Sequence, residues 1–178
     1  MRDEQEEVIL VDQDDRETGR AGKIAAHKFG YRHRAISVCV VDQNGRMLLQ
    51  RRAREKYHSA GLWTNACCTH PRPGEAVQSA AERRLNEELG VSCPLRWRLR
   101  THYQAPVGAD LIENEVVHLF VGSYGGNVLP NPHEVEAYAW RTRPALLAEM
   151  RDDPDAYTYW FKHYVRSFGD DIFGGAAN

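Results

Sequence analysis

Three short segments of the sequence bring together side chains that can do chemistry. They are the segment 64–71, with a cysteine pair and a histidine, the carboxylate-rich run 74–91, and Glu113-Asn114-Glu115. Structural needs alone rarely require a thiol, a metal-capable imidazole and paired carboxylates together in a small domain. We therefore expect a metal-dependent active site that contains a cysteine.

The spacing of these residues predicts which of them face the same way. Residues two apart on an extended segment point to one side, so Cys68 and His70 share a face, and Glu113 and Glu115 share another. Apolar residues continue the glutamate face, so both carboxylates should point inward. Two inward carboxylates raise each other's pKa unless a cation lies between them, and a divalent ion with His70 as a neutral ligand would provide one. Two upstream histidines could complete the shell: His27 and His33.

Other reactive side chains have ordinary structural interpretations. Cys39 and Cys93 are interpreted as small buried hydrophobic residues. A structural zinc site at Cys67, Cys68 and His70 stays open, although its spacing differs from that of a zinc finger. The remaining histidines are interpreted as surface or core residues: His58, His102, His118, His133 and His163.

The clearest predicted helix runs from Ala76 to Leu89 and ends at Gly90. Its apolar stripe at i, i+4 spacing also contains Arg84 and Glu88. A buried charge is costly unless it is paired or binds a metal. The two residues could form an internal ion pair, or the helix could border a cleft where Glu88 meets a cation and Arg84 meets an anion.

Length and composition indicate an ordinary globular protein. A chain of 178 residues with 42% hydrophobic residues predicts one domain over 1–178, with a flexible tail from about 174. A net charge of −2 argues against nucleic-acid binding, and no apolar run approaches the roughly 20 residues of a membrane helix. The acidic N-terminus lacks a signal peptide's apolar core, and four cysteines without a CxxC pair form no disulfide framework. We expect a cytoplasmic monomer that binds a small molecule.

Periodicity and turn signals predict mixed secondary structure. Strands are expected at 7–11, 35–41, 47–50, 62–68, 95–103, 116–124 and 135–140, with a hairpin at Asn44-Gly45. Helices are expected at 76–89, 143–151 and 155–168, whereas 12–22 should be turn-rich and 51–56 a loop edge. This order favours an α+β (α/β) fold, a mixed β-sheet packed between helices.

The helix and the segment before it resemble the box of the Nudix family, G-x5-E-x7-R-E-U-x-E-E-x-G-U, where U is aliphatic. The matching residues are Glu75, Arg83, Leu85, Glu87, Glu88, Gly90 and Val91. Thr69 stands where the box has its first glycine, and Arg84 stands where it has a metal-binding glutamate. The missing glutamate argues against ordinary diphosphate hydrolysis.

From about residue 8 to about residue 160 the sequence is similar to the type I isopentenyl diphosphate isomerases, which have a Nudix fold. The most specific segments are Trp63-Thr64-Asn65, Cys68, His70-Pro71 and Glu113-Asn114-Glu115-Val116. The resemblance implies conversion of isopentenyl diphosphate to dimethylallyl diphosphate in isoprenoid biosynthesis. The alternatives are a Nudix hydrolase of a nucleoside diphosphate derivative and a non-catalytic metal-binding or interaction module.

The resemblance also implies a role for each matched residue. One divalent ion, Mn²⁺ or Zn²⁺, would be held by His27, His33, His70, Glu113 and Glu115. Cys68 and Glu115 would form the acid–base pair, the carboxyl as acid and the thiolate as base, with Tyr103 assisting Glu115 and Trp160 covering the hydrocarbon end. Glu88 would help to bind Mg²⁺ carried by the diphosphate, whose oxygens would contact Lys23, Arg52, Lys56 and Arg84. His27 and His33 are one residue closer together than in the family's better-known bacterial members.

Overall fold

The computed structural model describes residues 6–108 and 110–174. In chain order the elements are β1 (Glu7–Val11), β2 (Glu17–Gly22), α1 (Lys23–Phe29), β3 (His33–Val41), β4 (Arg46–Arg52), β5 (Trp63–Thr64), β6 (Cys67–Thr69), α2 (Val77–Leu89), β7 (Leu95–Gly108), β8 (Leu111–Ser123), β9 (Val135–Thr142), α3 (Arg143–Asp152), the 3₁₀ turn η2 (Pro154–Ala156) and α4 (Tyr159–Phe173). The expected tail lies outside the described residues except for Gly174.

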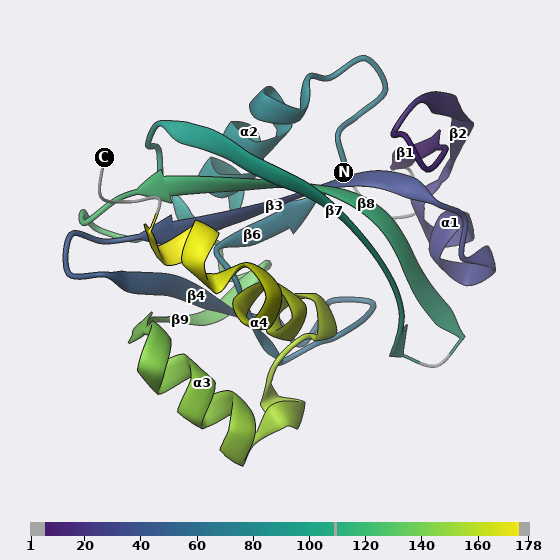
Figure 1. Cartoon of the computed structure of the whole chain (residues 1–178). Coiled ribbons are helices and arrows are strands. Elements are labelled where there is room, and N and C mark those ends of the chain that lie inside the picture. Colours follow the sequence, from purple (N-terminus) through teal and green to yellow (C-terminus); the bar gives the residue numbers. More distant parts are fainter. Residues whose placement is uncertain (1–5, 109, 175–178) are drawn as a thin grey trace.

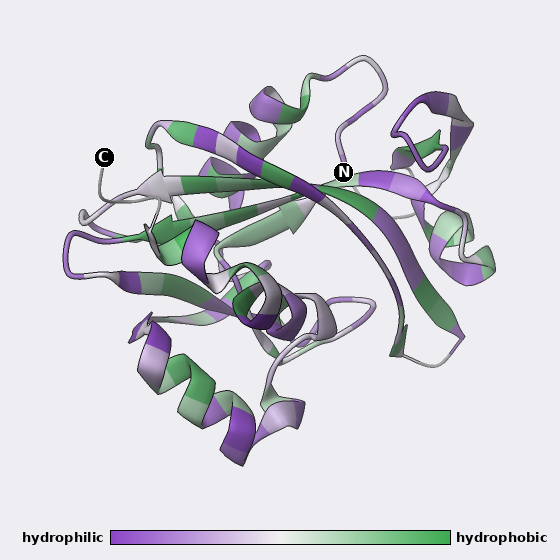
Figure 2. Cartoon of the chain, viewed as in Figure 1, coloured by the Kyte–Doolittle hydropathy of each residue, from purple (hydrophilic) through white to green (hydrophobic). Residues whose placement is uncertain are grey.

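A mixed sheet forms the middle of the molecule, with β3 at its centre (Figure 1). β3 pairs in parallel with β8 along its whole length, from His33 to Val41, and antiparallel with β6. β8 pairs antiparallel with β7, and the two strands form a long curved hairpin. β4 pairs with β3, β5 and β9, and β1 pairs with β3 and β2. The central strands carry mostly hydrophobic residues, whereas the helices mix both kinds (Figure 2).

Helices cover both faces of the sheet because β3 is apolar on both sides. Ile36 and Val38 pack in the same cluster as Leu85 of α2, while Cys39 packs with Phe161 of α4 on the opposite face. Successive strand residues point to opposite faces, so β3 contributes alternately to the two cores. The expected α+β fold with a mixed sheet between helices is confirmed.

Turn residues end two elements where the sequence predicts. Gly90 ends α2 with φ +62°, and a Cβ there would lie 2.9 Å from Leu129, so both the conformation and the close approach favour glycine. Gly45 has φ +70° in the turn between β3 and β4. Asp42 accepts bonds from the backbone N–H groups of Asn44 and Arg46 in the same turn.

Several predicted boundaries are wrong. The segment expected to be turn-rich contains β2, and the unpredicted helix α1 follows it. α1 has only seven residues and lacks a side-chain cap at Gly22, so it has little periodicity and no start signal. The expected loop edge at 51–56 begins inside β4, and β7 and β8 continue beyond their expected limits. The last helix begins at Tyr159, after η2, and deviates from helical geometry at Phe168. Within residues 6–108 and 110–174, no helix combines the length and hydrophobicity that crossing a membrane requires.

Candidate active site

A pocket of about 680 Å³ opens between the β7–β8 hairpin, α4 and the loop after β4. The long strands extend past the core, so their inward side chains line a cavity. The pocket is lined by the four residues expected to be catalytic: Cys68 from β6, Tyr103 from β7, Glu115 from β8 and Trp160 from α4. It is also lined by the four basic residues expected to meet the diphosphate: Lys23, Arg52, Lys56 and Arg84.

Three histidines and a glutamate converge at this pocket, and two of them, His70 and Glu115, line it. One ligand atom from each of His27, His33, His70 and Glu115 lies within 4.8 Å of the others. His70 Nε2 lies 3.0 Å from Glu115 Oε1 and 3.2 Å from His33 Nε2. His33 Nε2 lies 3.5 Å from the same carboxylate oxygen. Nitrogen and oxygen ligands at these separations suit a divalent ion.

The surroundings of the histidines also fit a metal. Nδ1 of His27 lies 2.8 Å from the Lys23 carbonyl, and Nδ1 of His33 lies 2.7 Å from the Tyr31 carbonyl. A carbonyl can only accept, so both Nδ1 atoms carry the proton and both Nε2 atoms present a lone pair. Among the described residues, His27 Nε2 and His70 Nδ1 are buried without a hydrogen-bond partner. Burial lowers the pKa of His27 to about 4 and that of His70 to about 3, which keeps the rings neutral.

Glu113, also expected to bind the ion, lies outside the group just described and forms a second one with His27 and His58. Its role as a ligand stays a prediction. The sequence predicts that His58 is a surface or core residue. It is buried, and its Nε2 lies 3.7 Å from Glu113 Oε1 at the pocket. It comes from the loop after β4, and no local pattern signals its direction. Within the described residues, the other four such histidines belong to neither group: His102, His118, His133 and His163.

Tyr103 connects the two glutamates. Its hydroxyl lies 2.7 Å from Glu113 Oε2 and 2.8 Å from Glu115 Oε2. Burial and the charge of Glu115 raise the pKa of Glu113 well above its ordinary value. Although burial acts in the opposite direction, the adjacent imidazoles of His33 and His70 hold the pKa of Glu115 well below its ordinary value. A phenol has one proton, so a protonated Glu113 donates to Tyr103 while Tyr103 donates to Glu115.

Cys68 faces the pocket with its sulfur in a polar setting. Sγ lies 3.1 Å from Ser37 Oγ and 3.4 Å from the side-chain nitrogen of Asn65. Sequence reasoning missed both partners. Burial raises the pKa of the Cys68 thiol to about 12, so the group rests as a thiol, and its role as a thiolate base stays a prediction.

The other cysteines take structural positions. Cys67 is fully buried in the core under α2, so it points away from its neighbour Cys68. In the described part of the chain, no group of metal-binding side chains includes a cysteine, which removes the zinc alternative at Cys67, Cys68 and His70. Cys39 is buried in the core, as expected, and Cys93 packs half-buried at its edge.

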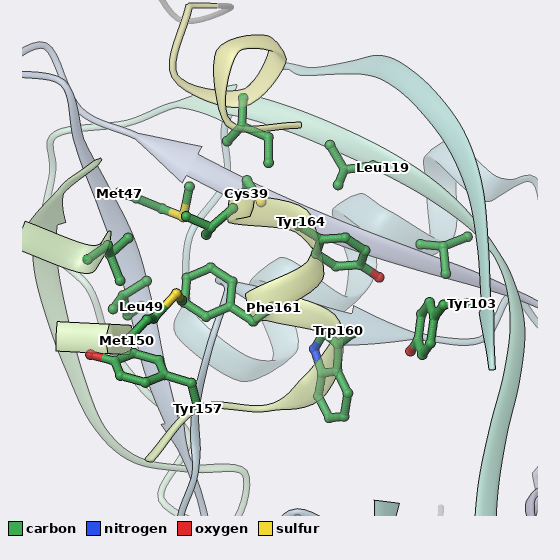
Figure 3. Packing of buried hydrophobic residues seen from close by; sticks show 14 of the residues in the cluster. Cys39, Met47, Leu49, Tyr103, Leu119, Met150, Tyr157, Trp160, Phe161 and Tyr164 are labelled. Carbon is green, nitrogen blue, oxygen red and sulfur yellow. The ribbon is translucent and has the colours of Figure 1, made fainter. Parts of the chain in front are cut away.

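Trp160 forms an aromatic wall of the pocket. Its Nε1–H donates to Thr64 Oγ1 over 2.8 Å, which fixes the indole, and only 2% of the residue is exposed. The guanidinium of Arg52 lies 5.4 Å from the ring centre, so the indole already faces a cation. Tyr103 on β7 lies across from Tyr164 of α4, one turn along from Trp160 (Figure 3).

Three of the four basic residues expected to meet the diphosphate are already paired with carboxylates. Arg84 Nε lies 2.5 Å from Glu88 Oε1, so the internal ion pair proposed from the sequence is present. A second carboxylate, that of Glu134, lies 2.6 Å from Arg84 Nη2 and also forms an ion pair with Lys56. Lys23 pairs with Glu6 at 2.8 Å. Glu134 was missed because it lies in a loop 50 residues after Arg84.

Comparisons with known proteins agree with this arrangement. Residues 31–161 match the model of the NUDIX domain. A Burkholderia multivorans protein named isopentenyl-diphosphate Delta-isomerase is 49% identical over 165 residues, which cover 93% of this chain and 94% of that protein. An Aromatoleum aromaticum protein named isopentenyl-diphosphate Delta-isomerase 1 is 47% identical over 158 residues, 89% of each.

Solved structures share the architecture at much lower identity. The Deinococcus radiodurans protein DR0079 has a TM-score of 0.75 at 17% identity, over 90% of this chain and 98% of that one. A MutT NUDIX hydrolase from Burkholderia pseudomallei has a TM-score of 0.61 at 22% identity, over 77% and 98%. At these identities the likeness shows the fold alone.

Proposed function

The chain belongs to the isopentenyl-diphosphate Delta-isomerases of the Nudix superfamily, and from this we infer that it converts isopentenyl diphosphate to dimethylallyl diphosphate. The observation that carries this function is the placement of Cys68 and Glu115 in one pocket with the indole of Trp160. A thiol and a carboxyl that line the same pocket suit proton transfer to and from carbon.

The reaction moves a double bond by one carbon. A proton adds to the terminal carbon of the alkene, and another leaves the carbon on the far side of the resulting cation. Because alkenes are weak bases, the acid must be held close in a dry pocket. We assign these two transfers to Cys68 and Glu115, which come from different strands.

In the chain without metal, Cys68 carries a proton and Glu115 does not, the reverse of a thiolate base and a carboxyl acid. For Glu115 to act as the acid and Cys68 as the base, the thiol proton would pass to the carboxylate before the substrate reacts, and each turnover would then restore the thiol and the carboxylate. The hydroxyl of Tyr103, 2.8 Å from Glu115 Oε2, would hold the protonated carboxyl in place. Tyr103 would thus assist Glu115.

Trp160 would stabilise the intermediate carbocation. An indole face attracts cations and offers no nucleophilic oxygen. In the chain without substrate the guanidinium of Arg52 lies 5.4 Å from this ring, so the indole is accessible to a cation. The bond to Thr64 would hold the ring in place throughout the reaction.

The basic side chains that line the pocket would bind the diphosphate: Lys23, Arg52, Lys56 and Arg84. Lys56 and Arg84 are balanced by Glu134 and Glu88, so this part of the site has little excess positive charge. A diphosphate that arrives with Mg²⁺ carries less negative charge and offers the carboxylates a cation. Glu88 would then help to bind that ion.

The histidine–glutamate cluster would hold one further divalent ion, Mn²⁺ or Zn²⁺. Such an ion supplies positive charge that favours the carboxylate form of its ligands. Glu115 is both a member of this cluster and a wall of the pocket, so metal binding and proton transfer meet at one residue. Its bonds to His70 and Tyr103 would orient the carboxyl toward the substrate.

Hydrolysis of a nucleoside diphosphate derivative is the alternative function. Ordinary Nudix hydrolysis uses a box glutamate at the position of Arg84, whose side chain here pairs with Glu88 and Glu134. Such a reaction also gives Cys68 no role. We further propose that the protein is cytoplasmic, which its four free cysteines support, and that it acts as a monomer.

A single assay separates the two functions. The full chain is incubated with isopentenyl diphosphate and Mg²⁺ after loading with Mn²⁺ or Zn²⁺, and dimethylallyl diphosphate and free phosphate are followed together. We expect the allylic product without phosphate. Phosphate release, or no product from metal-loaded protein, would contradict isomerisation and lead to nucleoside diphosphate substrates.

A further inference from the structure

One buried residue of the pocket has no role in the function proposed above. His58 lies in the loop between β4 and β5, and its side chain is only 7% exposed. It is surrounded by side chains of the site: its ring stacks on His27 at 5.6 Å and meets the edge of Trp160 at 6.0 Å. A residue placed in this way is held in a fixed orientation.

The nitrogen atoms of His58 have different partners. Nδ1 lies 3.3 Å from the hydroxyl of Ser59. Nε2 points to Glu113, whose Oε1 lies 3.7 Å away, beyond hydrogen-bond distance. The third member of this group is His27, whose Nε2 is buried and unpaired among the described residues. Two imidazole Nε2 atoms and a carboxyl group therefore converge.

These separations suit ligands that share an ion. Two atoms bound to one ion each lie about 2.1 Å from it, so they lie roughly 3–4 Å apart. The gap of 3.7 Å between His58 and Glu113 falls within this range. The ligand atoms of His27, His58 and Glu113 all lie within 4.8 Å of one another. The same holds for the ligand atoms of the group formed by His27, His33, His70 and Glu115.

We propose that His58 is a ligand of the divalent ion in this pocket, through Nε2 and together with His27 and Glu113. The inference rests on the proposed function, because it adds a residue to the metal site of that enzyme. His27 belongs to both groups of ligands, so the two groups form one continuous site. Glu113 then contributes its carboxylate to this site next to His58, and Glu115 contributes its carboxylate next to His33 and His70.

Cobalt binding to the full-length, metal-free chain tests this role without reference to catalysis. Co²⁺ is the probe because its visible absorption depends on its ligands. His58→Gln keeps a polar side chain, and His58→Phe keeps an aromatic ring that can pack on Trp160. We expect both changes to weaken Co²⁺ binding by at least about tenfold and to alter the absorption spectrum. His133→Gln, at the exposed rim of the pocket, is the matched control and should change neither.

His70→Gln separates this inference from the proposed metal site. If His70→Gln weakens Co²⁺ binding while both His58 variants bind with the wild-type affinity and spectrum, His58 only packs in the wall and the inference is wrong. If neither position affects Co²⁺ binding, the proposed metal site is wrong as well. Circular dichroism of the metal-free variants checks that each retains the fold.

Discussion

The hydroxyl of Tyr103 lies 2.8 Å from Oε2 of Glu115, and both side chains are buried. Glu113 lies on the other side of the hydroxyl at 2.7 Å. Tyr103→Phe removes the only group that joins the two carboxyls in the described structure. We expect kcat to fall by about 100-fold, the usual effect of losing a positioned proton donor, with little change in KM. Steady-state kinetics with isopentenyl diphosphate would measure both.

Tyr138→Phe provides the control for the loss of a phenol, because Tyr138 is exposed on β9. It should leave kcat unchanged. If Tyr103→Phe also turned over at the wild-type rate, Tyr103 would have no part in assisting Glu115.

The two adjacent cysteines should respond differently to the same substitution. Cys68 lines the pocket, whereas Cys67 is buried under α2 on the other side of β6. Cys68→Ala removes a proton carrier, so we expect kcat to fall by at least about 1000-fold with an unchanged melting temperature. Cys67→Ala should keep its turnover and lose about 1 kcal/mol of stability, since it only creates a small cavity. Rapid turnover by Cys68→Ala would exclude the thiol from proton transfer.

Arg84 should contribute separately to stability and to substrate binding. Arg84→Gln leaves Glu88 buried beside Gln50 without its cation, which should lower the free energy of unfolding by about 1–3 kcal/mol. It should also raise KM by at least about tenfold, because a charged contact to the diphosphate is lost. Urea unfolding and steady-state kinetics give the two values.

A double variant distinguishes the ion pair from the diphosphate clamp. Arg84→Gln combined with Glu88→Gln removes both charges, so stability should return toward that of the wild type. KM should stay high, because the guanidinium is still missing. A KM that recovers together with stability would mean that Arg84 only supports the fold.

Local patterns predicted the parts of the site that lie on regular elements. The two-residue spacing of Cys68 and His70, and of Glu113 and Glu115, correctly indicated side chains that share a cavity wall, because strand geometry fixes their direction. The expected apolar stripe on α2 is present, and the ion pair of Arg84 with Glu88 lies along it.

Residues brought in by loops could not be predicted in this way. His58 and Glu134 lie on irregular segments, whose course depends on packing against the whole sheet. The protonation of Cys68 was also missed, because the pKa of a thiol depends on its burial, and local sequence does not determine burial. The extent of β7 was underestimated partly because Pro106 interrupts the usual strand signal.

The metal-free protein should lose stability as the pH falls below neutrality. Burial lowers the pKa of His27 to about 4, of His58 to about 2 and of His70 to about 3, against about 6.5 in an unfolded chain. Above pH 6.5 these imidazole rings are neutral in both the folded and the unfolded chain. Between pH 6.5 and about 4 only the unfolded chain binds the protons, so the free energy of unfolding should decrease, by about 1–2 kcal/mol per histidine at pH 5. Urea unfolding after chelator treatment, at pH 7 and at pH 5, measures the loss.

Replacing one of these histidines tests the cause. His27→Gln should have a shallower pH dependence than the wild type, because one titrating group is gone, while His102→Gln, at an exposed position on β7, should keep the wild-type slope. Bound metal should oppose the loss near pH 6, since it stabilises only the folded state and competes with protons for the imidazoles. A free energy of unfolding that stays constant from pH 7 to pH 5 would mean that the rings become charged without unfolding, and that the cluster is more accessible to water than its burial indicates.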